Sequence, residues 1–128
     1  MPDHLAAPWA AFVAQARRVE DARQVLLGCL PVGRVDPAPV PVGLDLLRDE
    51  LRAIEAQVGA WHVPEVEPQW GACRDALAEA LAHVEPTREI ALSTDELEVL
   101  LDAVTDVIEP LDVWHDAERH WRSLRTRG

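Results

Sequence analysis

Apolar residues recur at helical spacing in four stretches of the chain, and no stretch alternates apolar and polar residues in the manner of a β-strand. The clearest repeat lies in residues 44–61, where steps of three and four positions separate the apolar side chains from Leu44 to Trp61. Such steps place the apolar side chains on one face of an α-helix. We therefore predict an all-α fold, an antiparallel four-helix bundle.

A long proline-rich connector should separate the first two helices. The first helix is expected to begin near Pro8, because proline suits the first helical turn, and to stop at Gly28. Residues 29–43 then contain four prolines and two glycines, which favour extended backbone over helix. A connector of this length could reach either end of the next helix, so the first two helices could be parallel or antiparallel.

The third helix is expected over residues 68–85, with Pro86 as its end. Ser93 and Glu96 have the spacing of a capping box, in which each side chain binds a free backbone N–H of the other residue. Leu92 stands where a hydrophobic staple would close onto the first turn of the next helix. These signals predict that a new helix begins just after Ser93.

Proline also predicts a kink or break in the last helix. Pro110 lacks a backbone N–H, so the helix should be interrupted there and resume over residues 111–125. The end of the chain, residues 119–128, is rich in arginine. Exchange of the connector and of the segment after Pro110 between two copies would give a homodimer, and light scattering would detect it.

Composition fits one cytoplasmic domain spanning residues 1–128. A chain of 128 residues with 48% hydrophobic residues can bury a core without metals or disulfides. No run approaches the roughly 20 apolar residues that span a bilayer, and no basic region followed by an apolar stretch marks a secretion signal. Cys29 and Cys73 form no CxxC motif, so we expect free thiols.

The charge of the chain is concentrated in one region. Residues 65–118 contain fifteen acidic side chains and only two basic ones, Arg74 and Arg88, a net charge of −13 within a total of −11. At 100° per residue, five of these acids fall along one side of the fourth predicted helix, opposite its apolar face. This acidic stripe consists of Asp95, Glu98, Asp102, Asp106 and Glu109.

Two interpretations of the acidic stripe are open at this stage: a solvated face that maintains solubility, and a surface that binds a basic protein. We predict an acidic helical protein-interaction module, such as an inhibitor, immunity or antitoxin-like protein for a basic partner. The negative charge disfavours nucleic acid, because phosphate backbones are repelled. A stripe along a helix also spreads its carboxylates instead of directing them at one cation.

Tryptophan provides five of the six aromatic residues and suggests a second site. If successive helices alternate in direction, four tryptophans and two histidines come together at one end of the bundle. Such a group would be either core packing or the lining of a small-ligand pocket with polar groups. Its members are Trp9, Trp61, His62, Trp70, Trp114 and His115.

No catalytic residue, metal site or cofactor is predicted. Asp112, His115 and Asp116 share a helical face, but no second Asp/Glu-x-x-His occurs on another helix, as a di-iron bundle would require. Neither cysteine has a histidine at the spacing of a local catalytic motif. We therefore expect binding rather than catalysis.

Two segments nevertheless resemble the acidic motifs of the all-α nucleotide pyrophosphohydrolases, namely residues 48–51 (Arg-Asp-Glu-Leu) and 95–98 (Asp-Glu-Leu-Glu). In that family, paired acidic helical motifs hold magnesium against a triphosphate, so the resemblance implies a magnesium-dependent enzyme as the alternative function. The chain departs from the pattern at Ala53, where the family has a third acid, and Glu98 and Asp102 do not have the family's Glu-x-x-Asp spacing.

Overall fold

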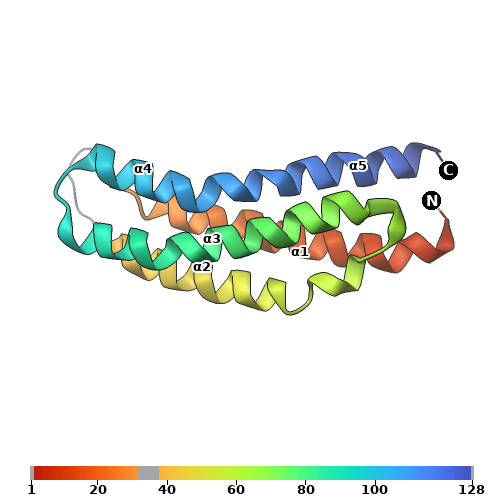
Figure 1. The fold of residues 1–128 in the computed structure, drawn as a ribbon, viewed down its shortest axis with the longest axis horizontal. Coiled ribbons are helices and arrows are strands. Elements are labelled where there is room, and N and C mark those ends of the chain that lie inside the picture. The colour runs from red at the N-terminus through yellow and green to blue at the C-terminus, as the bar shows by residue number, and fades with distance from the viewer. Residues whose placement is uncertain (1, 32–37, 128) are drawn as a thin grey trace.

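Four helical rods lie side by side and alternate in direction in the computed structural model, which describes residues 2–31 and 38–127 (Figure 1). The α-helices are α1 (Ala6–Gly28), α2 (Pro39–Glu55), α3 (Glu67–Ser93), α4 (Leu97–Ile108) and α5 (Val113–Arg127). The described residues contain no strand, so the predicted all-α four-helix bundle is confirmed. Helices α1 and α2 are antiparallel, and both chain ends lie at the same end of the bundle (Figure 1).

The fourth rod is built from two helices in succession. Between α4 and α5, residues Glu109–Asp112 form a short 3-10 helix, η4, which contains Pro110. Figure 1 shows α4 and α5 following one another along the same side of the bundle. The interruption predicted at Pro110 is therefore confirmed, and Trp114 and Trp121 beyond it are buried within a single chain.

Helix α2 begins earlier than the sequence suggested. It starts at Pro39, so Pro39 and Pro41 occupy its first turn, where a missing N–H leaves no hydrogen bond unmade. The predicted connector over residues 29–43 was therefore too long, and residues 32–37 of it lie outside the described part of the chain. At its other end α2 stops at Glu55, and Val58–Trp61 form the 3-10 helix η2.

The predicted end of the third helix at Pro86 was wrong, because α3 continues for seven residues beyond it, to Ser93. A proline inside a helix costs about 3 kcal/mol or more, so packing on the far side must compensate. Thr87 and Ala91 are buried there, and the Thr87 hydroxyl donates to the carbonyl oxygen of Ala103 in α4 at 3.1 Å. Contact with α4 therefore holds the last two turns of α3 together.

The predicted capping box was also wrong. Ser93 is the last residue of α3, and its hydroxyl donates to the carbonyl oxygen of Glu89 at 2.9 Å. The backbone N–H of Glu96 instead donates to the hydroxyl oxygen of Thr94 at 3.1 Å, and Glu96 is the residue before α4. Leu92 is 66% exposed, so it forms no staple, and Asp95 lies in the connection rather than in the helix.

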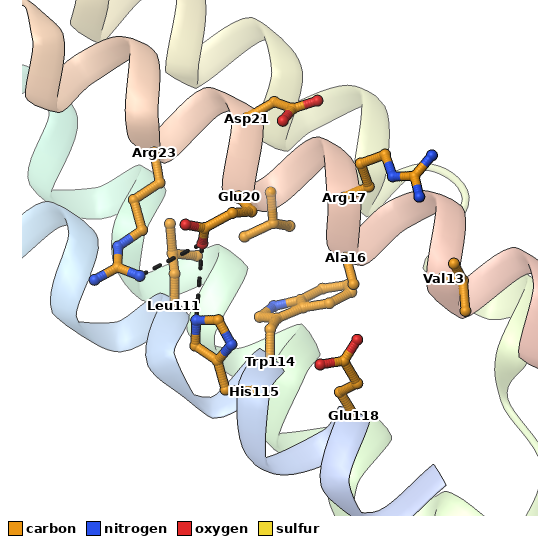
Figure 2. Close-up of a pocket in the computed structure, with 11 residues that line it drawn as sticks. Val13, Ala16, Arg17, Glu20, Asp21, Arg23, Leu111, Trp114, His115 and Glu118 are labelled. Atoms are coloured by element: carbon orange, nitrogen blue, oxygen red, sulfur yellow. Dashed lines mark hydrogen bonds and ion pairs between the residues drawn. The ribbon is translucent and has the colours of Figure 1, made fainter. Parts of the chain in front are cut away.

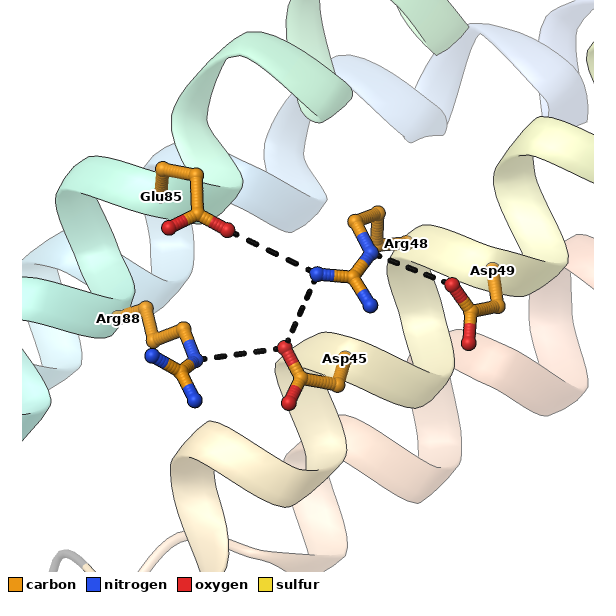
Figure 3. Close-up of polar contacts among 5 residues, drawn as sticks. All are labelled: Asp45, Arg48, Asp49, Glu85 and Arg88. Atoms are coloured by element: carbon orange, nitrogen blue, oxygen red, sulfur yellow. Dashed lines mark hydrogen bonds and ion pairs between the residues drawn. The ribbon is translucent and has the colours of Figure 1, made fainter.

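Helices α2 and α3 are joined on the surface by a network of ion pairs (Figure 3). Arg48 of α2 approaches Asp45 at 3.3 Å, Asp49 at 3.2 Å and Glu85 of α3 at 3.7 Å. Arg88 of α3 approaches Asp45 at 3.3 Å. The network thus uses Arg88, which is one of the two basic residues of the acidic segment.

Among the described helices, none is long and apolar enough to cross a membrane.

Candidate functional site

The acidic stripe lies on the outside of the fourth rod, but only part of it is on α4. Glu98, Asp102 and Asp106 project from α4, Glu109 belongs to η4, and Asp95 precedes the helix. All five side chains are exposed. We call the four that share the rod, Glu98, Asp102, Asp106 and Glu109, the acidic face.

No cation within the described ranges, residues 2–31 and 38–127, pairs with the acidic face. In the described part of the chain, neither Asp95 nor any carboxylate of the acidic face takes part in an ion pair. The two arginines of the acidic segment are occupied elsewhere. Arg74 approaches Asp75 at 3.3 Å and stands over the Trp70 ring at 4.9 Å, while Arg88 reaches α2.

Arg119, Arg122 and Arg125 of α5 have other partners than the acidic face. In α5, Arg119 pairs with Asp116, and Arg122 approaches Glu118 at 3.6 Å. Arg125 lies over the Trp9 ring, 5.4 Å from its centroid. Arg119 and Arg122 therefore neutralise acids of their own helix.

A hollow deepens the acidic face where α3 meets η4. Its cavity volume is about 340 Å³, and carboxylates from both rods line it. The lining residues are Glu79 and His83 of α3, with Asp106, Glu109, Pro110 and Val113. The sequence alone could not show that Glu79 and His83 stand beside Asp106 and Glu109, because this depends on how the two rods pack.

Four of the tryptophans surround Phe12 in the core. The Phe12 ring centroid lies 4.9 Å from Trp61 in an edge contact, 5.8 Å from Trp114 in a stacked contact, and 6.1 Å from both Trp9 and Trp121. Trp61 and Trp121 are fully buried, and Trp114 is 3% exposed. These rings pack directly against one another, so the space between them is filled.

Trp70 stands apart from that cluster and stacks on His62. The two rings are nearly parallel, with centroids 3.6 Å apart, and the Trp70 indole N–H donates to the carbonyl oxygen of Val58 at 2.9 Å. His62 also contacts the carboxylate of Glu67. Of the six residues predicted to form a pocket, Trp70 and His62 therefore make a separate pair.

Trp114 and His115 do line a cavity, which opens between α1 and α5 (Figure 2). We call it the α1–α5 cavity; its volume is about 260 Å³. Its apolar wall consists of Val13, Ala16, Val19, Leu111 and Trp114. Its polar wall consists of Arg17, Glu20, Asp21, Arg23, His115 and Glu118.

An ion-pair group crosses the α1–α5 cavity. Glu20 of α1 approaches Arg23 at 3.5 Å and His115 of α5 at 3.7 Å (Figure 2). A hydrogen bond from the Gln24 side chain, with smaller contributions from Arg23 and His115, lowers the pKa of the Glu20 carboxyl. The α1 side of this site was missed at the sequence level, because no motif links Glu20 to a residue 95 positions later.

The two segments that resemble the nucleotide pyrophosphohydrolase motifs do not form one site. Glu50 of α2 is paired with Arg18 of α1 at 2.5 Å, and Asp49 is paired with Arg48. Helix α2 packs on α1 and α3, whereas Glu98 lies on the outside of α4. No group of three or more His, Cys, Asp or Glu side chains in the described ranges is arranged to hold a metal ion.

Comparisons with protein-family models, curated proteins and solved structures find no match to this chain. What the candidate sites can bind is therefore inferred from their geometry alone.

Proposed function

We propose that this chain is a cytoplasmic protein-interaction module whose acidic face binds a basic protein. The observation that supports the proposal most directly is the acidic hollow, where Glu79, Asp106 and Glu109 stand together with no ion-pair partner among the described residues. Asp102 and Asp106 lie four positions apart on α4, and like charges at that helical spacing destabilise the chain by tenths of a kcal/mol per pair. A cationic partner would turn that cost into binding energy.

A hollow suits a basic side chain better than a flat acidic surface does. The guanidinium of an arginine presents several N–H donors in one plane, and carboxylates on two sides can accept them together. The remaining acids along α4 would raise the association rate by attracting a positively charged partner. The partner class that we infer is a basic protein held by an inhibitor, immunity or antitoxin-like module.

A homodimer remains a separate prediction. Trp114 and Trp121 are buried within one chain, so their burial does not require two copies to exchange the last helix. Light scattering would decide the number of subunits.

The proposal is tested first with a tetra-arginine peptide, whose binding is followed by NMR chemical-shift changes in α3 and α4. We expect the affinity to fall as salt is raised. We also expect it to fall at least about fivefold in the double variant Glu79→Gln plus Asp106→Asn, because the loss of even one charged contact of about 1 kcal/mol weakens binding about fivefold.

A matched control separates the acidic face from total charge. Asp3 and Glu55 are exposed acids outside the acidic face, so Asp3→Asn plus Glu55→Gln removes the same charge elsewhere. Wild type, the Glu79→Gln plus Asp106→Asn variant and the control variant then serve as bait in a native lysate. Wild type and the control should retain a basic protein, and the Glu79→Gln plus Asp106→Asn variant should not. Equal loss in both variants, or salt-independent binding, would count against the proposal.

A further inference from the structure

The α1–α5 cavity has an unused hydrogen-bond donor in its wall. The indole nitrogen of Trp114 is buried, and none of the described residues provides it with an acceptor. In contrast, the Trp61 indole donates to Gln15 at 2.9 Å and the Trp70 indole donates to Val58 at 2.9 Å. A buried N–H without a partner is costly, so such a group calls for an acceptor.

Arg23, in the polar wall of the same cavity, carries a second donor for which the described residues offer no acceptor. The Nε atom of Arg23 is buried without a hydrogen-bond partner among the described residues, although its terminal nitrogens approach Glu20 and Asp112. Both unused donors thus belong to residues that line one cavity. The indole N–H of Trp121 likewise has no acceptor among residues 2–31 and 38–127, but Trp121 does not line the α1–α5 cavity.

His115 lies on the side of the cavity next to the Trp114 indole (Figure 2). Figure 2 shows the nitrogen side of the Trp114 ring facing the space between Glu20 and His115. The His115 side chain is 57% exposed, and the one ion pair it makes with the described residues is its 3.7 Å contact with Glu20. Rotation of an exposed side chain is fast and costs little, so a ligand can reach the indole N–H when the imidazole turns aside.

The size and charge of the cavity limit the ligand. A volume of about 260 Å³ is below the roughly 300–1,000 Å³ of typical drug-sized sites, so the ligand is small. Its apolar wall favours an apolar body. An anion would be repelled by Glu20, Asp21 and Glu118, which outnumber the arginines of the polar wall.

We propose that the α1–α5 cavity binds a small uncharged molecule, apolar over most of its surface, with one carbonyl-type oxygen that accepts a hydrogen bond from the indole N–H of Trp114. This site is separate from the acidic hollow, which lies between α3 and η4. The inference therefore does not depend on the proposed protein partner.

The probe is acetophenone, which joins an apolar ring to one carbonyl oxygen. Two molecules of similar size serve as comparisons: ethylbenzene, which lacks the oxygen, and benzoate, which carries a negative charge. Binding is followed through the indole N–H signals in a ¹⁵N-labelled protein. We expect acetophenone to shift the Trp114 signal downfield in a saturable way, and to bind about fivefold more tightly than ethylbenzene and than benzoate.

Three variants distinguish the hydrogen bond from general affinity for apolar molecules. Trp114→Phe removes the donor and should abolish the preference for acetophenone over ethylbenzene. Trp121→Phe removes the unpartnered indole outside the cavity and should leave that preference unchanged. Ala16→Met keeps the Trp114 donor but fills the cavity from its apolar wall, so it should weaken the binding of both acetophenone and ethylbenzene.

Several results would overturn the inference. Equal affinity of wild type for acetophenone and ethylbenzene would show that the indole N–H is not used. Persistence of the preference in Trp114→Phe would place the hydrogen bond elsewhere. No saturable shift with any probe would show that the cavity holds only water or collapses in solution.

Discussion

The indole N–H of Trp61 donates a 2.9 Å hydrogen bond to the side-chain oxygen of Gln15, and both residues are buried. The amide nitrogen of Gln15 donates in turn to the carbonyl oxygen of Gln57 at 2.8 Å. The side chain of Gln15 in α1 therefore binds both the Trp61 indole of η2 and the turn between α2 and η2. Gln15 lies three positions after Phe12 and four before Val19, which are buried residues of the same helix.

Replacement of Gln15 by leucine should lower the free energy of unfolding by about 1–3 kcal/mol, because the buried Trp61 N–H loses its acceptor. Trp61→Phe should also destabilise the protein, since Gln15 is then left with an unpaired oxygen. The double variant should cost less than the sum of the two, because neither polar group remains. Urea denaturation of the four proteins measures this coupling, and additive effects would argue against the hydrogen bond.

Two glycines should respond in opposite directions to replacement by alanine. At Gly43, an added Cβ would lie 2.7 Å from the Cys29 sulfur and 3.3 Å from a Leu26 methyl group, so Gly43→Ala should cost about 1–3 kcal/mol through overpacking. At Gly71, within α3, nothing lies within 4 Å of the added atom. Gly71→Ala should therefore stabilise the helix by about 0.5–1 kcal/mol.

Thermal and urea denaturation give the sign of each change. Adding Cys29→Ala to Gly43→Ala should recover part of the lost stability, because it removes the sulfur nearest to the new methyl group. A Gly43→Ala protein at least as stable as wild type would contradict the close approach of Cys29 and Leu26 to Gly43, and a destabilised Gly71→Ala protein would contradict the open space at Gly71.

The two free cysteines should differ in reactivity. Cys73 is fully buried, and this burial raises the pKa of its thiol to about 12. At pH 8 only about one Cys73 in 10⁴ is then a thiolate, which is the form that reacts with disulfide reagents. Cys29 is partly exposed. We expect one thiol to react with a disulfide reagent in the native protein and both to react after unfolding, and Cys73→Ser should leave the native rate unchanged.

Local sequence patterns predicted the elements of this fold, while its junctions depended on contacts distant in sequence. The spacing of apolar residues predicted the helices, and Pro110 predicted the interruption between α4 and α5. The same logic failed at Pro86, because burial of Thr87 and Ala91 against α4 compensates for one missing hydrogen bond. Ser93 has the spacing of a cap but binds a carbonyl in its own helix.

The candidate sites also differ in whether a local sequence pattern could predict them. The acidic residues of the fourth rod were predicted, since they follow helical spacing along one segment. The hollow beside Glu79 and the cavity beside Glu20 were not, because each needs residues from two rods to meet. Ion pairs that join different helices, such as Arg18 with Glu50, likewise leave no local signal.

Glu20 should make the stability of the protein depend on pH in the acidic range. The Gln24 amide donates a hydrogen bond to its carboxylate, and Arg23 and His115 lie nearby, so its pKa in the folded protein is below the ordinary 4.5. The unfolded chain then binds a proton more readily than the folded one. The stabilisation is therefore fully present above pH 4.5 and is lost as the pH falls through the lowered pKa.

The measurement compares wild type with Glu20→Gln by urea denaturation at neutral pH and at several pH values below 4.5. The difference in unfolding free energy should be largest at neutral pH and should shrink as the pH falls, because protonated Glu20 and glutamine are both neutral. Protonation of the other acids also relieves repulsion within a chain of net charge −11, and it affects both proteins. Glu55→Gln, at an exposed position on α2, corrects for the loss of one charge. A difference that stays constant with pH after this correction would contradict the contacts assigned to Glu20.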